Sequence, residues 1–175
     1  MRNIYILILI LTITSCNSQH KKDDVGVKEE LMETTYYLIR HAEKDRSDPS
    51  NSNPALSKTG VERAKSWSEY FKDIPLNAIY STNLTRTQQT ASYTASEKSI
   101  NVQTYDPTNL YNKTFKDDTA GKKVLIVGHS NTTPFFVNKI IGESKYKDIP
   151  DNENGMLYIV TIVGDEKEVA IKTIN

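Results

Sequence analysis

The chain has 175 residues, and 22 lysines and arginines balance 22 aspartates and glutamates, so its formal net charge at neutral pH is zero. This length suggests one domain with a real hydrophobic core. The balanced charge gives the molecule no bias toward nucleic acid, and we expect no nucleic-acid partner. A single cysteine, Cys16, excludes an intrachain disulfide.

Residues 1–15 have the layout of a secretory signal peptide. Arg2 precedes an almost wholly apolar run, which small residues separate from Cys16. The run is shorter than the roughly 20 residues of a membrane-spanning helix. The Ile-Thr-Ser-Cys segment at residues 13–16 resembles the lipobox of bacterial lipoproteins. The resemblance implies lipidation of Cys16 and export to a membrane-anchored site, periplasmic or associated with the outer membrane. A plain cleaved signal with an incidental cysteine is the alternative.

Residues 16–32 are predicted to be a flexible tether, because they contain too few apolar residues to bury. His20 lies in this segment and is interpreted as a solvated side chain rather than a metal ligand. The rest of the chain, residues 33–175, is predicted to form a single domain.

The first predicted strand covers residues 34–39, which are rich in β-branched and aromatic side chains, and it stops at Arg40 and His41. Turn-forming residues over 44–54 predict a loop, which we expect to wall a site beside His41. A helix then opens with Ser57 or Thr59 as its cap.

A second strand is predicted over residues 77–81, and the helix after it begins within residues 81–91. Its first turn would offer free backbone N–H groups to an anion. Arg86 lies about one turn inside. It is either directed at the strand ends or a surface arginine. A third strand over residues 100–105 precedes Asp106, and residues 108–119 have a weak helical pattern.

The most continuous apolar strand covers residues 123–127 and is followed by Gly128 and His129. We expect Gly128 to let the backbone pass close to a ligand. A helix starts at Asn131. Strands over residues 156–163 and 169–174, joined by a turn at 164–167, are predicted to form an antiparallel pair.

Alternating strands and helices predict an α/β three-layer sandwich, in which a mostly parallel sheet carries helices on both faces and an antiparallel strand pair at its C-terminal end. Arg40, His41, Arg86 and His129 can then converge where the strands end. Two arginines and a histidine would cradle a phosphoryl dianion, and the other histidine could attack phosphorus in line. A metal site is disfavoured because two arginines would repel a cation. A serine hydrolase is disfavoured because no Gly-x-Ser-x-Gly elbow is present.

Four segments, in order over residues 34–141, resemble motifs of the histidine phosphatase (phosphoglycerate mutase-like) superfamily, and the chain is closest in size to its short branch-1 members. Arg40-His41-Ala42-Glu43 resembles Arg-His-Gly, with alanine in place of the usual glycine. The segments Leu56 to Gly60, Ser81 to Ala91 and Gly128 to Ser130 resemble the helix start, the second-arginine segment and the second-histidine motif.

The resemblance implies a phosphatase of small phosphomonoesters or of phosphohistidine, without metal or organic cofactor. His41 would be the nucleophile, forming a phosphohistidine, while Arg40, Arg86 and His129 would bind the phosphoryl group. Two nearby arginines should lower the pKa of His41 and keep its ring neutral. Further candidates for substrate binding are Asn131 and Glu43.

The general acid stays open between Asp106, which is favoured, Glu43, and neither residue. Asp106 could instead only start an Asp-Pro turn. A non-catalytic phosphate-binding lipoprotein is an alternative function, and a mutase is a weaker one, because the loops look too small to close a lid. The sequence leaves the physiological substrate and the oligomeric state open.

Overall fold

The computed structural model describes residues 32–174, which lie in one compact unit, Leu31–Asn175. The signal peptide, the lipidation of Cys16 and nearly all of the tether lie outside the described residues and stay predictions. Within the described part of the chain, no helix is both long and apolar enough to cross a bilayer.

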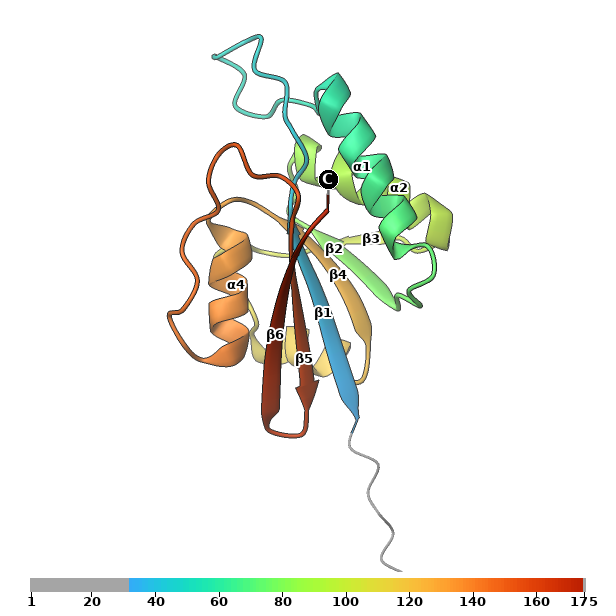
Figure 1. The fold of residues 1–175 in the computed structure, drawn as a ribbon, viewed down its shortest axis with the longest axis vertical. Coiled ribbons are helices and arrows are strands. Elements are labelled where there is room, and N and C mark those ends of the chain that lie inside the picture. Colours follow the sequence, from blue (N-terminus) through green and yellow to red (C-terminus); the bar gives the residue numbers. More distant parts are fainter. Residues whose placement is uncertain (1–31, 175) are drawn as a thin grey trace, which may run out of the picture. The chain divides into compact units, whose positions relative to one another are not determined.

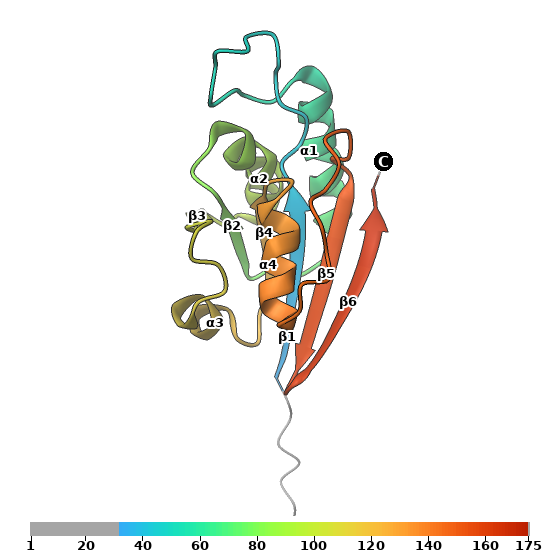
Figure 2. The ribbon, with the colours of Figure 1, turned by 90° about the vertical axis from the view of Figure 1, so that its left-hand side faces the viewer.

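Strands and helices alternate along the chain as far as β5 (Figures 1 and 2). In chain order the elements are β1 (Glu33–Arg40), α1 (Lys58–Phe71), β2 (Ala78–Ser81), α2 (Thr85–Lys98), β3 (Val102–Thr104), α3 (Lys113–Thr119), β4 (Lys123–Gly128), α4 (Thr132–Ile141), β5 (Met156–Val163) and β6 (Glu166–Thr173).

The six strands form one sheet in the order β3-β2-β4-β1-β5-β6. The first four run parallel to one another, whereas β5 runs antiparallel to β1 and β6 antiparallel to β5. The predicted α/β class, with a mostly parallel sheet and an antiparallel C-terminal pair, is therefore confirmed. The turn is tighter than predicted. Gly164, in the left-handed region at φ 60°, and Asp165 make a two-residue hairpin, so β6 begins at Glu166.

Helices cover both faces of the sheet. Successive side chains of a strand point to opposite faces, so a buried strand can contribute to both hydrophobic clusters. In β1, Tyr36 and Leu38 pack in the cluster that holds the buried residues of α3 and α4. Tyr37 and Ile39 pack in the cluster that holds those of α1 and α2. Trp67 is 1% exposed in this second cluster, and the predicted three-layer arrangement is confirmed.

The pairing of β1 with β4 positions the functional residues. Arg40 is the register partner of Gly128, and the His41 amide donates to the Gly128 carbonyl at 2.9 Å. Because these neighbours are parallel, their carboxyl ends lie at the same edge of the sheet. The residue after each strand is a histidine, and the loop before β5 starts that strand at this same edge.

Candidate active site

The two strand-ending histidines lie side by side. Their ring centroids are 5.5 Å apart and the rings are inclined by 66°. His41 is 5% exposed. Its Nδ1 lies 2.7 Å from the carbonyl oxygen of Ala42. A carbonyl oxygen can only accept, so Nδ1 carries the proton and Nε2 keeps a free lone pair. This is the tautomer that a nucleophilic histidine needs.

Both rings are neutral at pH 7. Burial lowers the pKa of His41 to about 3. The Ala42 hydrogen bond opposes this shift, and the charges of His129, Arg86 and Arg40 add to it. Burial, followed by the charges of Arg86 and Arg40, lowers the pKa of His129 to about 4. The predicted effect of the arginines is therefore present, but removal from water is the larger cause.

These shifts predict a loss of stability in mild acid. Between pH 6.5, the ordinary histidine pKa, and about 4, the unfolded chain binds protons at His41 and His129 that the folded chain does not. The free energy of unfolding should therefore decrease as the pH is lowered from 7 to 5, by up to about 2 kcal/mol for each histidine. Urea denaturation at both pH values measures the slope. His129→Asn should flatten it, and an equally steep slope in that variant would contradict the assignment.

Arg40 is held by the loop before β5. Its side chain is 3% exposed. Nη1 donates to the carbonyl oxygens of Pro150, Asp151 and Glu153, and Nη2 lies 2.8 Å from Asp151 Oδ1. Asp151 also binds Arg46, which lies 57% exposed at the surface. The two arginine partners lower the pKa of the Asp151 carboxyl, so this carboxylate is charged and competes with a substrate anion for Arg40.

Arg86, in the first turn of α2, has more unused hydrogen-bond donors than Arg40. Its Nε and Nη1 are buried and have no hydrogen-bond partner among the described residues. Burial and the charge of Arg40 lower its pKa. Charged donors without an acceptor are rare in a protein interior, so this guanidinium marks a place for an anion. The α2 terminus itself is less open than predicted, because Asn53 Oδ1 accepts from the Thr85 amide at 2.8 Å.

The two candidate acids differ in their surroundings: Glu43 lines the cleft beside His41 and keeps Oε2 buried without a hydrogen-bond partner among the described residues, whereas Asp106 lies in a turn. Glu43 Oε1 accepts from Arg63 Nε at 2.7 Å, and Arg63 Nη1 donates to the Ile174 carbonyl. Asp106 Oδ1 accepts from the amide and the hydroxyl of Thr108, which lower the pKa of its carboxyl. Asp106 thus occupies the Asp-Pro turn that was the alternative to an acid role.

Two further residues named in the sequence analysis make local contacts. The Asn131 side chain accepts from the Thr132 amide at 2.9 Å and so caps α4. A Cβ at Gly128 would lie 2.8 Å from both Thr133 Oγ1 and the Tyr105 hydroxyl. These two side chains therefore approach Gly128 closely.

A cleft of about 170 Å³ opens beside His41. The loop after β1 contributes Lys44 and Arg46, as predicted for a wall of the site. The loop before β5 contributes Asp151, Asn152 and Asn154, which sequence reasoning missed. The buried Asn154 donates from Nδ2 to the His41 carbonyl at 2.9 Å and so joins this loop to His41. The only signal in the sequence was the polarity of the loop.

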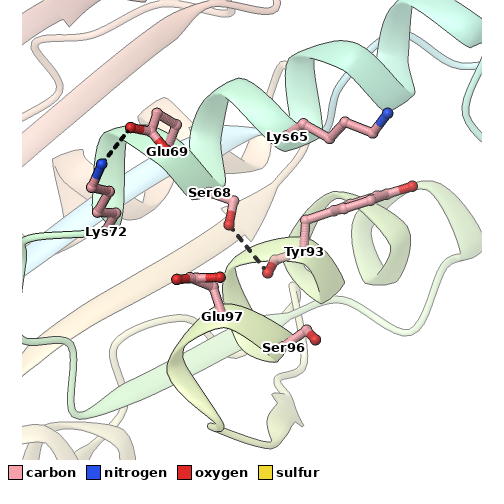
Figure 3. A pocket seen from close by; sticks show the side chains of 7 residues that line it. All are labelled: Lys65, Ser68, Glu69, Lys72, Tyr93, Ser96 and Glu97. Atoms are coloured by element: carbon pink, nitrogen blue, oxygen red, sulfur yellow. Dashed lines mark hydrogen bonds and ion pairs between the residues drawn. The ribbon is translucent and has the colours of Figure 1, made fainter.

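A second hollow, of about 340 Å³, lies between α1 and α2 (Figure 3). Its polar side chains are partly satisfied by one another, as in the Lys72–Glu69 pair and the bond from Ser68 to the Tyr93 carbonyl. None of the site residues lines it. In the described part of the chain, no three His, Cys, Asp or Glu side chains gather as metal ligands would.

Comparison with known proteins agrees with the fold and the motifs. Residues 36–107 match the family model described as histidine phosphatase superfamily (branch 1). No curated protein matches the chain.

Three solved structures illustrate the likeness. A protein histidine phosphatase SixA complexed with tungstate is 12% identical with a TM-score of 0.64, over 79% of this chain and 96% of that one. A phosphoglycerate mutase from Bacillus anthracis is 14% identical with a TM-score of 0.61, over 81% and 93%. A protein provisionally assigned as phosphohistidine phosphatase SixA from Agrobacterium tumefaciens is 19% identical with a TM-score of 0.59, over 80% and 98%.

The matched segment contains Arg40 and His41. His129 follows β4, which lies beyond that segment, and the pairing of β4 with β1 brings it next to them. Residues 36–107 thus match the histidine phosphatase superfamily (branch 1) in sequence, and the whole described domain resembles the solved histidine phosphatase structures in fold.

Proposed function

We propose that the chain is a metal-independent phosphatase that hydrolyses small phosphomonoesters, or the P–N bond of phosphohistidine, through a phosphohistidine intermediate on His41. One observation carries the proposal. A neutral histidine with a free Nε2 lies in a site where the Nε and Nη1 groups of Arg86 are buried and have no partner in the described part of the chain. A nucleophile next to an unfilled anion site suits phosphoryl transfer, which depends on positioning and on neutralising the equatorial oxygens.

The reaction has two steps. His41 Nε2 forms a bond to phosphorus while the bond from phosphorus to the leaving group breaks. Water then attacks phosphorus, the P–N bond to His41 breaks, and inorganic phosphate leaves. Overall, water gives a hydroxyl to the phosphate and a proton to the leaving group. Arg86 neutralises the oxygens in both steps, His129 contributes once its ring is protonated, and Arg40 joins them when it exchanges Asp151 for the substrate.

The engagement of both candidate acids bears on the leaving group. Glu43 is paired with Arg63, and Asp106 is held in its turn by Thr108. A leaving group that departs without a strong proton donor is therefore favoured, and aryl phosphates and phosphohistidine are of this kind.

The test is hydrolysis of 4-nitrophenyl phosphate by the purified full chain in the presence of a chelator. His41→Ala should lower kcat at least about a thousandfold, because loss of the nucleophile removes the covalent route. Brief mixing with substrate should also leave an acid-labile phosphoryl group on the native chain and none on the variant. His20→Ala is the matched control and should turn over normally.

The same experiment separates the alternative. A chain that binds inorganic phosphate but turns over no substrate, with or without His41, would be a phosphate-binding protein. Equal turnover by the native chain and His41→Ala would overturn the proposed mechanism.

A further inference from the structure

Hydrogen bonds lead from His129 to the start of α2. His129 Nε2 lies 2.9 Å from the Thr82 hydroxyl oxygen, and that oxygen lies 2.9 Å from the Thr87 hydroxyl oxygen. Thr82 is 2% exposed and Thr87 is fully buried. Water therefore does not compete for these groups, and their protons must be distributed among the protein atoms present.

The direction of this series follows from the Thr87 hydroxyl, which has one proton. Carbonyl oxygens of Leu84 and Thr82 lie 2.8 and 2.9 Å from it and are stronger acceptors than a hydroxyl oxygen. The Thr87 proton is therefore donated to a carbonyl, and its oxygen accepts from Thr82. The Thr82 oxygen in turn accepts from His129, which requires a proton on Nε2.

We propose that Thr82 is a positioning residue that holds neutral His129 as the Nε2–H tautomer and leaves Nδ1 unprotonated. His41 has the opposite arrangement, since its Nδ1 donates to Ala42 and its Nε2 is bare. Each ring thus keeps one lone pair, on different nitrogens. The role in catalysis rests on the proposed phosphatase function, whereas the tautomer itself does not.

The tautomer gives His129 a definite task. A bare Nδ1 can accept a proton but cannot donate one to a phosphoryl oxygen. When a phosphomonoester monoanion binds, its P–OH proton can pass to Nδ1, which leaves a dianion beside an imidazolium. The ring becomes a donor only after that transfer. The preferred substrate form is therefore the monoanion, which brings its own proton into the site.

Besides its hydrogen bond with Thr82, His129 has several charged or titratable neighbours. Arg40 and His41 approach from the end of β1, Arg86 approaches from α2, and the Tyr105 hydroxyl lies close to Gly128. None of them bonds to Nε2 in the structure, so they influence the charge of the ring but not the choice of nitrogen that Thr82 makes.

The test is the tautomer of each ring, read by two-bond ¹H–¹⁵N correlation on the full chain with labelled histidine. The chain has three histidines, and His20→Ala and His41→Ala assign the signals. At pH 7 we expect His129 protonated on Nε2 and His41 on Nδ1. Thr82→Val keeps the side-chain shape but removes the acceptor. It should mix the two His129 tautomers and leave the His41 signals in place, while Thr82→Ser should restore the native pattern.

Kinetics give a second readout. Thr82→Val should lower kcat/KM for 4-nitrophenyl phosphate about tenfold, as expected for one lost hydrogen bond, and Thr82→Ser should recover it. A native His129 protonated on Nδ1 would overturn the proposal, and so would a Thr82→Val spectrum identical to the native one. If Thr82→Val does not fold, the native and Thr82→Ser spectra still decide. An inactive native chain with the expected tautomers would refute the phosphatase function and leave the positioning role standing.

Discussion

Arg86→Ala is expected to lower kcat/KM for an aryl phosphate by about a thousandfold, the loss typical of a charged group that stabilises a phosphoryl-transfer transition state. The reason is geometric. Both Nη atoms of Arg40 are already bonded to the loop before β5 and only its Nε lacks a partner among the described residues, whereas Arg86 keeps both Nε and Nη1 buried and unpartnered. Arg86 thus supplies most of the charged donors that remain available for a phosphoryl group. Steady-state kinetics with 4-nitrophenyl phosphate measure the loss.

Two companion variants make the result specific. Arg86→Lys keeps a charge but has no planar fork, so it should recover only a small part of the activity. Lys98→Ala removes a positive charge from the last turn of α2, at the opposite end of the helix from Arg86, and should change kcat/KM less than twofold, since salt screens charges over that separation. A loss of only a few fold in Arg86→Ala, with inorganic phosphate still bound normally, would mean that Arg40 is the principal phosphoryl ligand.

The convergence of the histidines could be predicted because it depends on local pattern and on a general rule of topology. The apolar runs before His41 and His129 define two buried strands, and adjacent parallel strands end at one edge of a sheet. Arg86 could be placed only as one of two options, because its spacing on a helix does not say which way the helix faces. The cluster of α1 and α2 on one face of the sheet settles that orientation.

The loop before β5 could not be predicted to hold Arg40. The bonds from Arg40 to Pro150, Asp151 and Glu153 span more than 100 residues and involve mostly backbone carbonyls, which leave no mark on side-chain pattern. The buried bond from Asn154 to the His41 carbonyl is of the same kind. Such contacts depend on the path of an irregular segment, and hydrophobic periodicity carries no information about that path.

The conformation of Asp106, by contrast, follows from a local rule that can be applied to the sequence. An aspartate before proline accepts hydrogen bonds from the residue two positions on, and Asp106 does this with the Thr108 amide and hydroxyl. Its place in the chain suggested a role by analogy with larger relatives. The short-range hydrogen bonds of the turn hold the carboxylate where it is.

Gly60→Ala is expected to destabilise the fold by about 2–3 kcal/mol, although alanine is the better helix former by nearly 1 kcal/mol. Gly60 lies in the first turn of α1, where Ser57 caps its amide. A Cβ there would collide with the carbonyl oxygen of Glu43 and lie 2.9 Å from the Glu43 carbonyl carbon. That same oxygen accepts from the Ser57 amide, so the collision opposes the contact that fixes the helix start. Urea denaturation at pH 7 measures the loss.

The collision should also reduce activity, because Glu43 is two residues from His41 and backbone cannot yield as a flexible side chain does. At a temperature where Gly60→Ala is fully folded, kcat should still fall, since a displaced Glu43 moves the chain that carries His41, the proposed nucleophile. Thr59→Ala is the control. This neighbouring position is exposed, so alanine there should change stability by less than about 0.5 kcal/mol. If Gly60→Ala instead stabilised the protein as helix propensity alone requires, α1 would be free to move away from the strand end, and its start would not help to position His41.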